Sequence, residues 1–205
     1  MPSRNVIKLD IGQSYYHVYA RGTNKQLIFN EAADYAFFVH LFERYLSSRP
    51  AKRSFGSVYP HYYGRLQLLT YCLMPNHFHL LLYQEEQGAM SAFMHSLMTS
   101  YSRYFNLKHG RTGSLFESRY KAARIEDQSY LEHISRYIHL NPRRWRRYAY
   151  SSLQFYTKDA PPEWLYPTKI TELFTSTQEY LTFLQEYEGH RQMLDSVKHM
   201  LANQN

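Results

Sequence analysis

The chain has a single cysteine among its 205 residues, Cys72, so it can hold neither an internal disulfide framework nor a cysteine-based zinc site. This cysteine lies in an apolar stretch and is predicted to be a buried core thiol. No apolar run approaches membrane-spanning length, and no N-terminal segment has the apolar core of a signal peptide. These absences predict a cytoplasmic protein in a reducing compartment, with no membrane association.

Acidic residues are also scarce, with 17 Asp and Glu against 24 Lys and Arg and a net charge of +7. The excess is local, because residues 103–147 alone carry 11 basic and 4 acidic side chains. A basic segment interleaved with aromatic residues is typical of a surface that binds nucleic acid. The candidate phosphate-binding residues are Arg103, Lys108, Arg111, Arg119, Lys121, Arg143, Arg144, Arg146 and Arg147.

The apolar content of 44% indicates a folded globule of about one domain. Hydrophobic periodicity and turn signals predict strands near residues 15–20, 65–74, 77–84 and 120–125. Helices are expected near residues 31–46, capped by Asn30, 89–108, and 129–141, capped by Ser129. A long surface loop is expected at 47–64, and an amphipathic stretch at 178–201 that Gly189 can interrupt. This order predicts the α+β class, a ferredoxin-like antiparallel sheet with helices on one face.

The most informative stretch is the hairpin at residues 65–84, whose second arm begins with His77, Phe78 and His79. Residues two apart on a strand point to the same face, so both imidazoles should project side by side. Such a pair is suited to holding a divalent metal. With 11 histidines in the chain, about 0.6 such pairs are expected by chance, so the pair alone is weak evidence.

A second group of polar residues lies on the helix expected at 129–141. His133, Tyr137 and Asn141 are spaced four apart and should share one face. A tyrosine followed four residues later by Asn or Gln also occurs at Tyr63, Tyr83 and Tyr150, and Tyr150 is the main competitor. Only Tyr137 combines a capped helix with the basic segment, although tyrosines commonly serve as ordinary packing residues at such boundaries.

These features together resemble a known family, the REP-associated tyrosine transposases. They are relatives of the insertion-sequence-200-like single-tyrosine transposases, whose His-hydrophobe-His pair is called the HUH motif. The matching stretches, in the expected order, are residues 16–22, 74–82, 113–121 and 136–142. The resemblance covers roughly residues 14–155, which makes it far more specific than any single motif.

The resemblance implies an HUH endonuclease fold in residues 1–155, followed by a helical C-terminal extension, residues 156–205, with no assigned role. It implies a single-stranded DNA endonuclease and strand transferase in a bacterial cell, active at the nucleoid on hairpins of repetitive palindromes. His77 and His79 would bind Mg²⁺ or Mn²⁺, and Tyr137 would attack the DNA. Asn141 occupies a position where relatives often place Gln as third ligand. A homodimer is left open.

Two other interpretations stay open on the sequence. The chain could be a non-catalytic hairpin-binding protein with a vestigial metal site, or a nuclease that uses water while Tyr137 is structural. A zinc hydrolase is disfavoured, because no Glu or further His follows the pair at helical spacing.

Overall fold

The structure is a computed structural model that describes residues 10–54 and 56–187. Its centre is a four-stranded antiparallel sheet in the order β2-β3-β1-β4. The strands are β1 (Ser14–Arg21), β2 (Leu66–Met74), β3 (His77–Gln84) and β4 (Lys121–Ile125). This strand order, with β1 antiparallel to both β3 and β4, is that of a ferredoxin-like sheet. The predicted α+β class and antiparallel sheet are confirmed.

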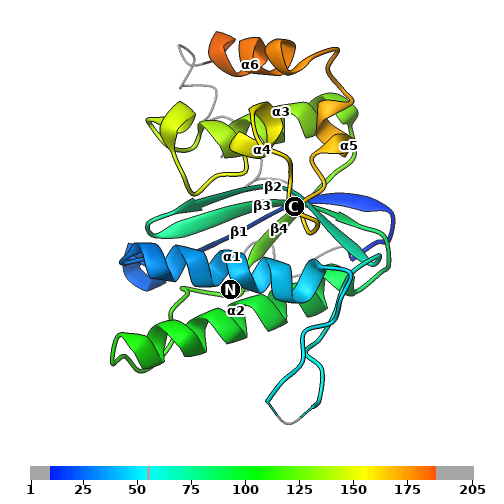
Figure 1. Cartoon of the computed structure of the whole chain (residues 1–205). Coiled ribbons are helices and arrows are strands. Elements are labelled where there is room, and N and C mark those ends of the chain that lie inside the picture. The colour runs from blue at the N-terminus through cyan, green and yellow to red at the C-terminus, as the bar shows by residue number, and fades with distance from the viewer. Residues whose placement is uncertain (1–9, 55, 188–205) are drawn as a thin grey trace, which may run out of the picture.

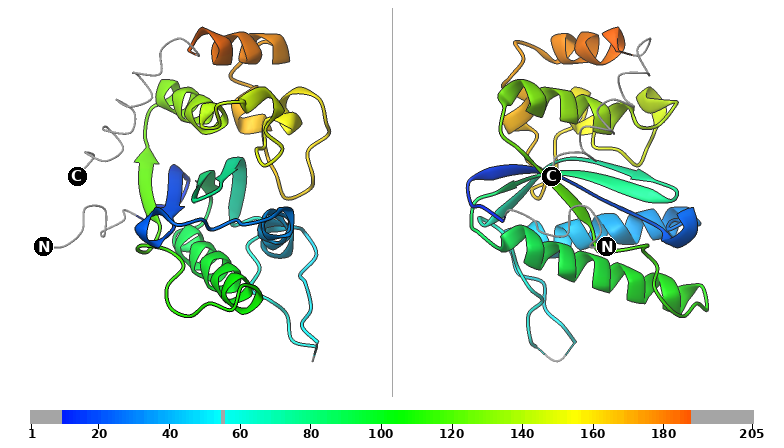
Figure 2. Two further views of the ribbon diagram at one scale, coloured as in Figure 1. Left: turned by 90° about the vertical axis from the view of Figure 1, so that its left-hand side faces the viewer. Right: turned by 180° about the vertical axis from the view of Figure 1, so that it is seen from behind.

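Helices cover both faces of the sheet (Figure 1). On one face lie α1 (Ala32–Leu46) and α2 (Ala89–Lys108). The opposite face carries α3 (Gln128–Leu140), with the short helices α4 (Gln154–Thr157) and α5 (Thr168–Thr171) and with α6 (Thr177–Glu186) outside them (Figure 2). Two 3₁₀ turns, η1 (Thr23–Lys25) and η2 (Trp145–Arg147), complete the described elements.

The prediction of helices on one face holds for α1 and α2 but is wrong for α3. The reason lies in the strands, which are apolar on both sides. Phe78 and Leu80 of β3 are buried in the α1–α2 core, whereas Leu81 is buried in the core under α3. A sheet with two apolar faces needs a helical layer on each of them.

Both predicted helix caps are displaced along the chain. At α1 the N-cap is Glu31, which forms a reciprocal capping box with Asp34, whereas Asn30 only donates its backbone N–H to Asp34 at 2.8 Å. At α3 the N-cap is Asp127, whose carboxylate accepts the backbone N–H of Ser129 at 2.7 Å. A carboxylate is a strong acceptor at a helix N-terminus, so it takes the capping position ahead of the serine.

Residues 156–187 contribute to the core that lies under α3. Tyr156, Ile170 and Tyr180 are buried together with Ile134 and Ile138 of α3. The predicted division between residues 155 and 156 therefore falls inside α4 and within a shared core. The assignment of two separate segments stays a prediction, and the glycine break predicted at Gly189 lies outside the described residues.

A buried hydrogen-bond network ties α3 to α6 and to β2. His139 is fully buried, with Nδ1 2.7 Å from the Tyr180 hydroxyl and Nε2 2.8 Å from the Ser152 hydroxyl. The Ser152 hydroxyl in turn accepts the backbone N–H of Tyr71 on β2 at 2.9 Å. Burial lowers the pKa of His139 to about 3, so the imidazole is neutral at physiological pH. The network fixes the rotation of α3 over the sheet.

We expect Tyr180→Phe to lower the free energy of unfolding by about 1–3 kcal/mol, because it leaves the buried His139 Nδ1 without its partner. Urea denaturation monitored by circular dichroism measures this change. The matched control is Tyr59→Phe, whose ring lies at the surface beneath the guanidinium group of Arg44, 4.4 Å away. Equal midpoints for the two variants would show that the network contributes nothing.

The long loop between α1 and β2 is irregular as predicted, apart from one isolated bridge between Lys52 and Val58. It projects from the α1–α2 side of the molecule, away from α3 (Figure 1). Among the described residues, no helix combines the length and the apolar character that a membrane crossing needs.

Candidate active site

The histidine pair lies at the start of β3, directly after the tight turn that joins it to β2. Both imidazoles face the α3 side of the sheet, with ring centroids 5.0 Å apart and planes at 87°. Phe78, between them, points into the opposite core and is fully buried. The predicted alternation along this strand is confirmed, and it places His77 and His79 beneath α3.

His77 is oriented by the residue before it. Its Nδ1 donates to the Asn76 side-chain oxygen at 2.7 Å, while the Asn76 amide nitrogen donates to the Lys25 carbonyl at 3.1 Å. Because Nδ1 carries the proton, Nε2 is the ring nitrogen with a lone pair. That nitrogen lies 3.2 Å from the side-chain oxygen of Asn141. Two acceptor atoms face each other here, an arrangement that a shared cation stabilises.

Tyr137 reaches the same place from α3. Its ring packs edge-on against His79, with centroids 5.2 Å apart, and against His17 at 5.8 Å. Only 5% of the residue is exposed, so it is buried more deeply than the boundary position that the helix pattern predicts. Asn141 follows one turn later, at the C-cap of α3.

His133 does not join this group. Its ring lies 5.9 Å from that of Phe183 in α6, and its Nδ1 contacts the guanidinium group of Arg136. Eight residues turn an α-helix about 80° beyond two full turns, so His133 and Asn141 point in different directions. The predicted common face is wrong for His133, whereas Tyr137 and Asn141 both face the histidine pair.

Tyr150 lies in the other core and has no described ring contact with the histidine pair. Its ring stacks on that of Tyr35 at 3.6 Å, with planes at 8°, and it packs against the α1–α2 core. Of the two tyrosines that the sequence leaves in competition, only Tyr137 has a described ring contact with the imidazoles.

A third histidine, His17, belongs to the site, and the sequence reasoning assigned it no role. It lies on β1, is 1% exposed, and its Nε2 is 2.9 Å from Nδ1 of His79. Burial lowers the pKa of His17 to about 3, so this imidazole is neutral at physiological pH. The only signal in the sequence is the alternation of His17 and Tyr19, which places both on one face of β1 but does not say which strand is their neighbour.

The residues present fit a divalent metal. Two ligands held at right angles by one Mg²⁺ at about 2.1 Å are about 3 Å apart, which is close to the 3.2 Å between His77 Nε2 and Asn141 Oδ1. Two imidazoles and an amide oxygen would leave coordination positions open, as in a catalytic divalent-metal site and unlike a closed structural zinc site. Within the described ranges, no three His, Cys, Asp or Glu side chains are grouped as metal ligands. The side-chain oxygen of Asn141 is the polar atom that lies beside His77 Nε2, at 3.2 Å.

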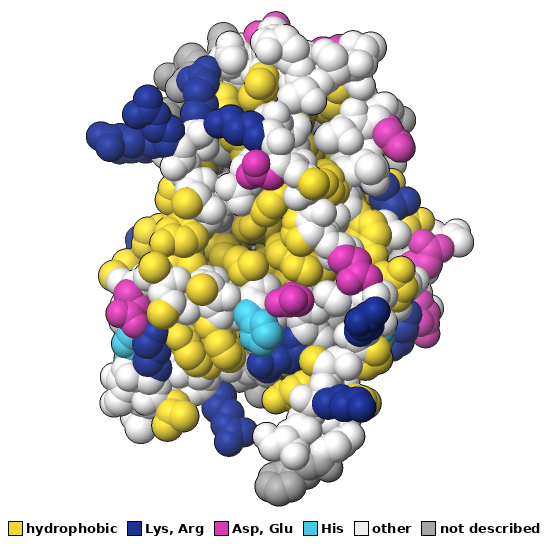
Figure 3. Space-filling view, in the orientation of Figure 1, with side chains coloured by type: hydrophobic (Ala, Val, Ile, Leu, Met, Phe, Trp, Pro, Cys, Tyr) yellow, Lys and Arg dark blue, Asp and Glu magenta, His cyan; other side chains and the backbone are white. Residues whose placement is uncertain are grey.

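The predicted phosphate-binding residues divide into two groups. Lys108 pairs with Glu31 and with Asp34, the latter at 3.2 Å, and Arg111 donates to the Gln26 side chain at 2.9 Å. The other group has no ion pair or hydrogen bond to an acidic or amide side chain among the described residues; its members are Arg103, Arg119, Arg143, Arg144 and Arg147, which are exposed, and Lys121, which is half-buried. Arg146 is exposed as well. Basic side chains gather beside the C-terminal end of α3 (Figure 3), the end at which Asn141 is the C-cap.

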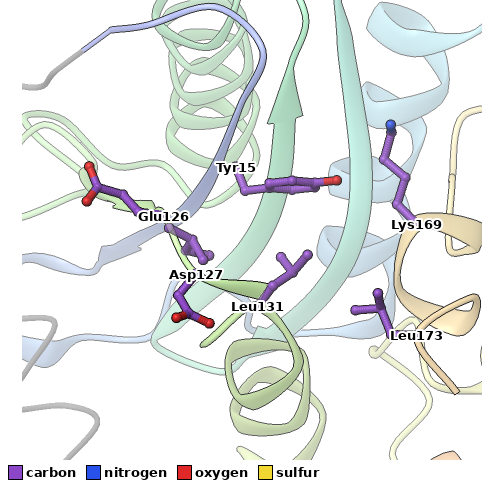
Figure 4. Close-up of a pocket in the computed structure, with 7 residues that line it drawn as sticks. Tyr15, Glu126, Asp127, Leu131, Lys169 and Leu173 are labelled. Carbon is purple, nitrogen blue, oxygen red and sulfur yellow. The ribbon is translucent and has the colours of Figure 1, made fainter. Parts of the chain in front are cut away.

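Two hollows lie beside the sheet. A groove of about 1430 Å³ runs between α2 and residues 113–121 and is lined by Arg119 and Lys121. A smaller pocket of about 220 Å³ lies at the start of α3. Figure 4 shows its residues, which include Tyr15, Glu126, Asp127, Leu131, Lys169 and Leu173. Neither hollow is lined by His77, His79 or Tyr137.

Comparison with known proteins adds two findings. Residues 60–141 match the family described as "Transposase IS200 like", a range that contains His77, His79, Tyr137 and Asn141. The resemblance to IS200-like transposases is therefore confirmed. A solved structure described as "Structure of the REP associates tyrosine transposase bound to a REP hairpin" is similar to this chain with a TM-score of 0.53. The similarity covers 71% of this chain and 80% of that one at 13% identity, which shows a shared fold. No curated protein matches.

Proposed function

We propose that this chain is a metal-dependent endonuclease and strand transferase for single-stranded DNA, a transposase that cleaves near hairpins of repetitive palindromes. The supporting observation is the meeting of Tyr137 and Asn141 of α3 with the histidine pair of β3. The Tyr137 ring lies 5.2 Å from that of His79, and the Asn141 oxygen 3.2 Å from His77. All four residues come from one chain, so this centre needs no second copy.

In this proposal His77, His79 and Asn141 hold Mg²⁺ or Mn²⁺. These three residues would hold the ion beside the scissile phosphodiester, where its charge would counter the negative charge that develops during cleavage. The shorter side chain of Asn, compared with the Gln of many relatives, still reaches His77 because α3 ends directly above the start of β3. Burial of the Tyr137 ring against two imidazoles holds the phenol beside the same centre.

The reaction is a transesterification at phosphorus. The Tyr137 oxygen loses its proton and forms a bond to phosphorus, the bond to the 3′ oxygen breaks, and that oxygen takes up a proton. The products are a covalent 5′-phosphotyrosine and a free 3′-OH. Since the bond energy is retained in the phosphotyrosine, a second DNA 3′-OH can attack it without ATP, which completes strand transfer.

DNA binding is assigned to the exposed basic residues near the site. Arg143, Arg144, Arg146 and Arg147 lie within six residues after Asn141, and all four are exposed. In this proposal they bind phosphates of the DNA near the scissile bond. The solved relative is bound to a REP hairpin, and we propose the same class of partner here, which locates the activity at the DNA in the cytoplasm.

Labelled hairpin DNA tests the proposed chemistry. A single strand with a 3′-end label, incubated with the wild-type chain and Mn²⁺, should give a labelled protein band on a denaturing gel. The same strand with a 5′-end label should give a shortened free product, because only DNA on the 3′ side of the cut stays on the tyrosine. EDTA should abolish both products.

The alternatives give different results. A binding protein with a vestigial metal site retards the hairpin on a native gel but yields neither product. A nuclease that uses water releases free fragments from both labelled strands and never labels the protein. Either outcome would overturn the proposal.

A further inference from the structure

We propose that His17 is a positioning residue that fixes the tautomer and orientation of His79, so that His79 presents Nε2 to the divalent cation. This inference rests on the metal site of the proposed function and adds a residue to it. His17 itself is not a candidate ligand, because its Nε2 is directed at the ring of His79.

The contact between the two imidazoles has the geometry of an in-plane hydrogen bond. His17 Nε2 and His79 Nδ1 are 2.9 Å apart, the ring planes differ by 17°, and the centroids are separated by 5.1 Å. With rings nearly coplanar and nitrogens facing each other, the N–H of one ring points at the lone pair of the other. One of these two nitrogens, His17 Nε2 or His79 Nδ1, therefore carries the proton and the other accepts the hydrogen bond.

The sheet register brings these side chains together. On the paired strands Tyr19 is opposite His79, and His17 is opposite Leu81. His17 is thus the diagonal neighbour of His79 on the same face, a separation that an imidazole can bridge. Because β1 lies between β3 and β4 inside the sheet, its backbone is held on both sides and gives His17 a rigid base.

His77 shows the same arrangement with a different partner. Its Nδ1 donates to Asn76, which leaves Nε2 toward Asn141. If His79 Nδ1 donates to His17, the two imidazoles of the pair are matched, each with its proton on Nδ1 and its lone pair on Nε2. Metal-binding histidines are commonly fixed in this way by an acceptor on the second ring nitrogen.

The burial of His17 supports a role beyond packing. Its Nδ1 is buried and has no hydrogen-bond partner in the part of the chain that the structure describes. A buried polar nitrogen without a partner disfavours folding, so a residue that only filled this space would be better apolar. Among the described residues, the side-chain hydrogen bond of His17 is the one with His79.

Metal affinity tests the inference without DNA. Mn²⁺ titration by calorimetry should give a dissociation constant for His17→Phe that is about 10- to 100-fold larger than that of the wild type. Phe retains an aromatic ring but cannot accept the hydrogen bond from His79 Nδ1. His17→Gln, whose side-chain oxygen can accept from His79 Nδ1, should restore most of the affinity. Thermal melts of all variants report whether each is folded.

Nitrogen NMR provides a second readout that a purely structural residue would not move. In the metal-free wild type, the ¹⁵N shifts of His79 should show the proton on Nδ1. In His17→Gln this tautomer should persist, and in His17→Phe it should be lost. A His79 proton on Nε2 in the wild type would overturn the inference even if His17→Phe does not fold.

His79→Ala separates this inference from the proposed function. If the wild type and His79→Ala bind Mn²⁺ equally, the metal site itself is wrong and the proposed function fails with it. If His79→Ala loses Mn²⁺ but His17→Phe binds as tightly as the wild type, the metal site stands and only the role of His17 is refuted.

Discussion

Tyr137→Phe is expected to abolish the covalent protein–DNA adduct and to slow strand cleavage by at least about 10³-fold. The substitution removes the attacking oxygen and leaves the ring, whose edge-on contacts with His79 and His17 hold α3 against the sheet. The fold and the hairpin affinity should therefore be unchanged. The measurement is the amount of protein-linked 3′-label formed with Mn²⁺ over time.

The matched control is Tyr150→Phe, which also removes one phenol oxygen from a tyrosine packed against aromatic neighbours. Because Tyr150 stacks on Tyr35 in the other core, its variant should form adduct at the wild-type rate. Adduct formation by Tyr137→Phe, or its loss in Tyr150→Phe alone, would assign the nucleophile elsewhere and remove the central element of the proposed function.

Simultaneous replacement of Arg143, Arg144 and Arg147 by Ala is expected to weaken hairpin binding by about 30- to 100-fold at physiological salt. All three side chains are exposed beside the C-terminal end of α3. Arg146 is retained, because its guanidinium group lies 4.2 Å from the Trp145 ring and contributes to packing. The slope of log affinity against log salt should become shallower by about 2 to 3. Fluorescence anisotropy over a range of salt concentrations measures both quantities.

A control with the same change in net charge is available in the loop between α1 and β2. Arg49, Lys52 and Arg53 are also exposed, and this loop projects from the opposite side of the molecule (Figure 1). Their triple replacement by Ala should leave the hairpin affinity within about twofold of wild type, since salt screens exposed charges that lie on the opposite side of the molecule from the DNA. Equal losses of hairpin affinity in both variants would indicate a general effect of net charge. The arginines after α3 would then make no specific phosphate contacts.

Local patterns predicted most of the secondary structure. The hairpin of β2 and β3 and the helix α2 appear at their predicted places, because hydrophobic alternation and helical periodicity are properties of short segments. The cap predictions at Asn30 and Ser129 were wrong by one or two residues. Several acceptors compete at each helix start, and only the folded backbone decides which of them meets the free N–H groups.

Side-chain partners were predicted less well than elements. Lys108 was predicted from its charge to bind phosphate, which stays a prediction, but its ion pairs with Glu31 and Asp34 were not predicted. His17 was assigned no role, although its Nε2 lies 2.9 Å from Nδ1 of His79. Both cases depend on residues more than sixty positions away in the chain, and no local pattern records such pairing.

The sequence by itself determined the alternation that turns His77 and His79 to one face, the helix that carries Tyr137 and Asn141, and the basic segment after it. These follow from the periodicity of strands and helices within a few residues. Only the tertiary structure decided that α3 crosses the sheet face opposite to α1 and α2, that Tyr137 rather than Tyr150 meets the imidazoles, and that His17 contacts His79. The reason is that strand order, register and helix rotation are set by packing between distant segments, which bury two apolar faces of one sheet at once.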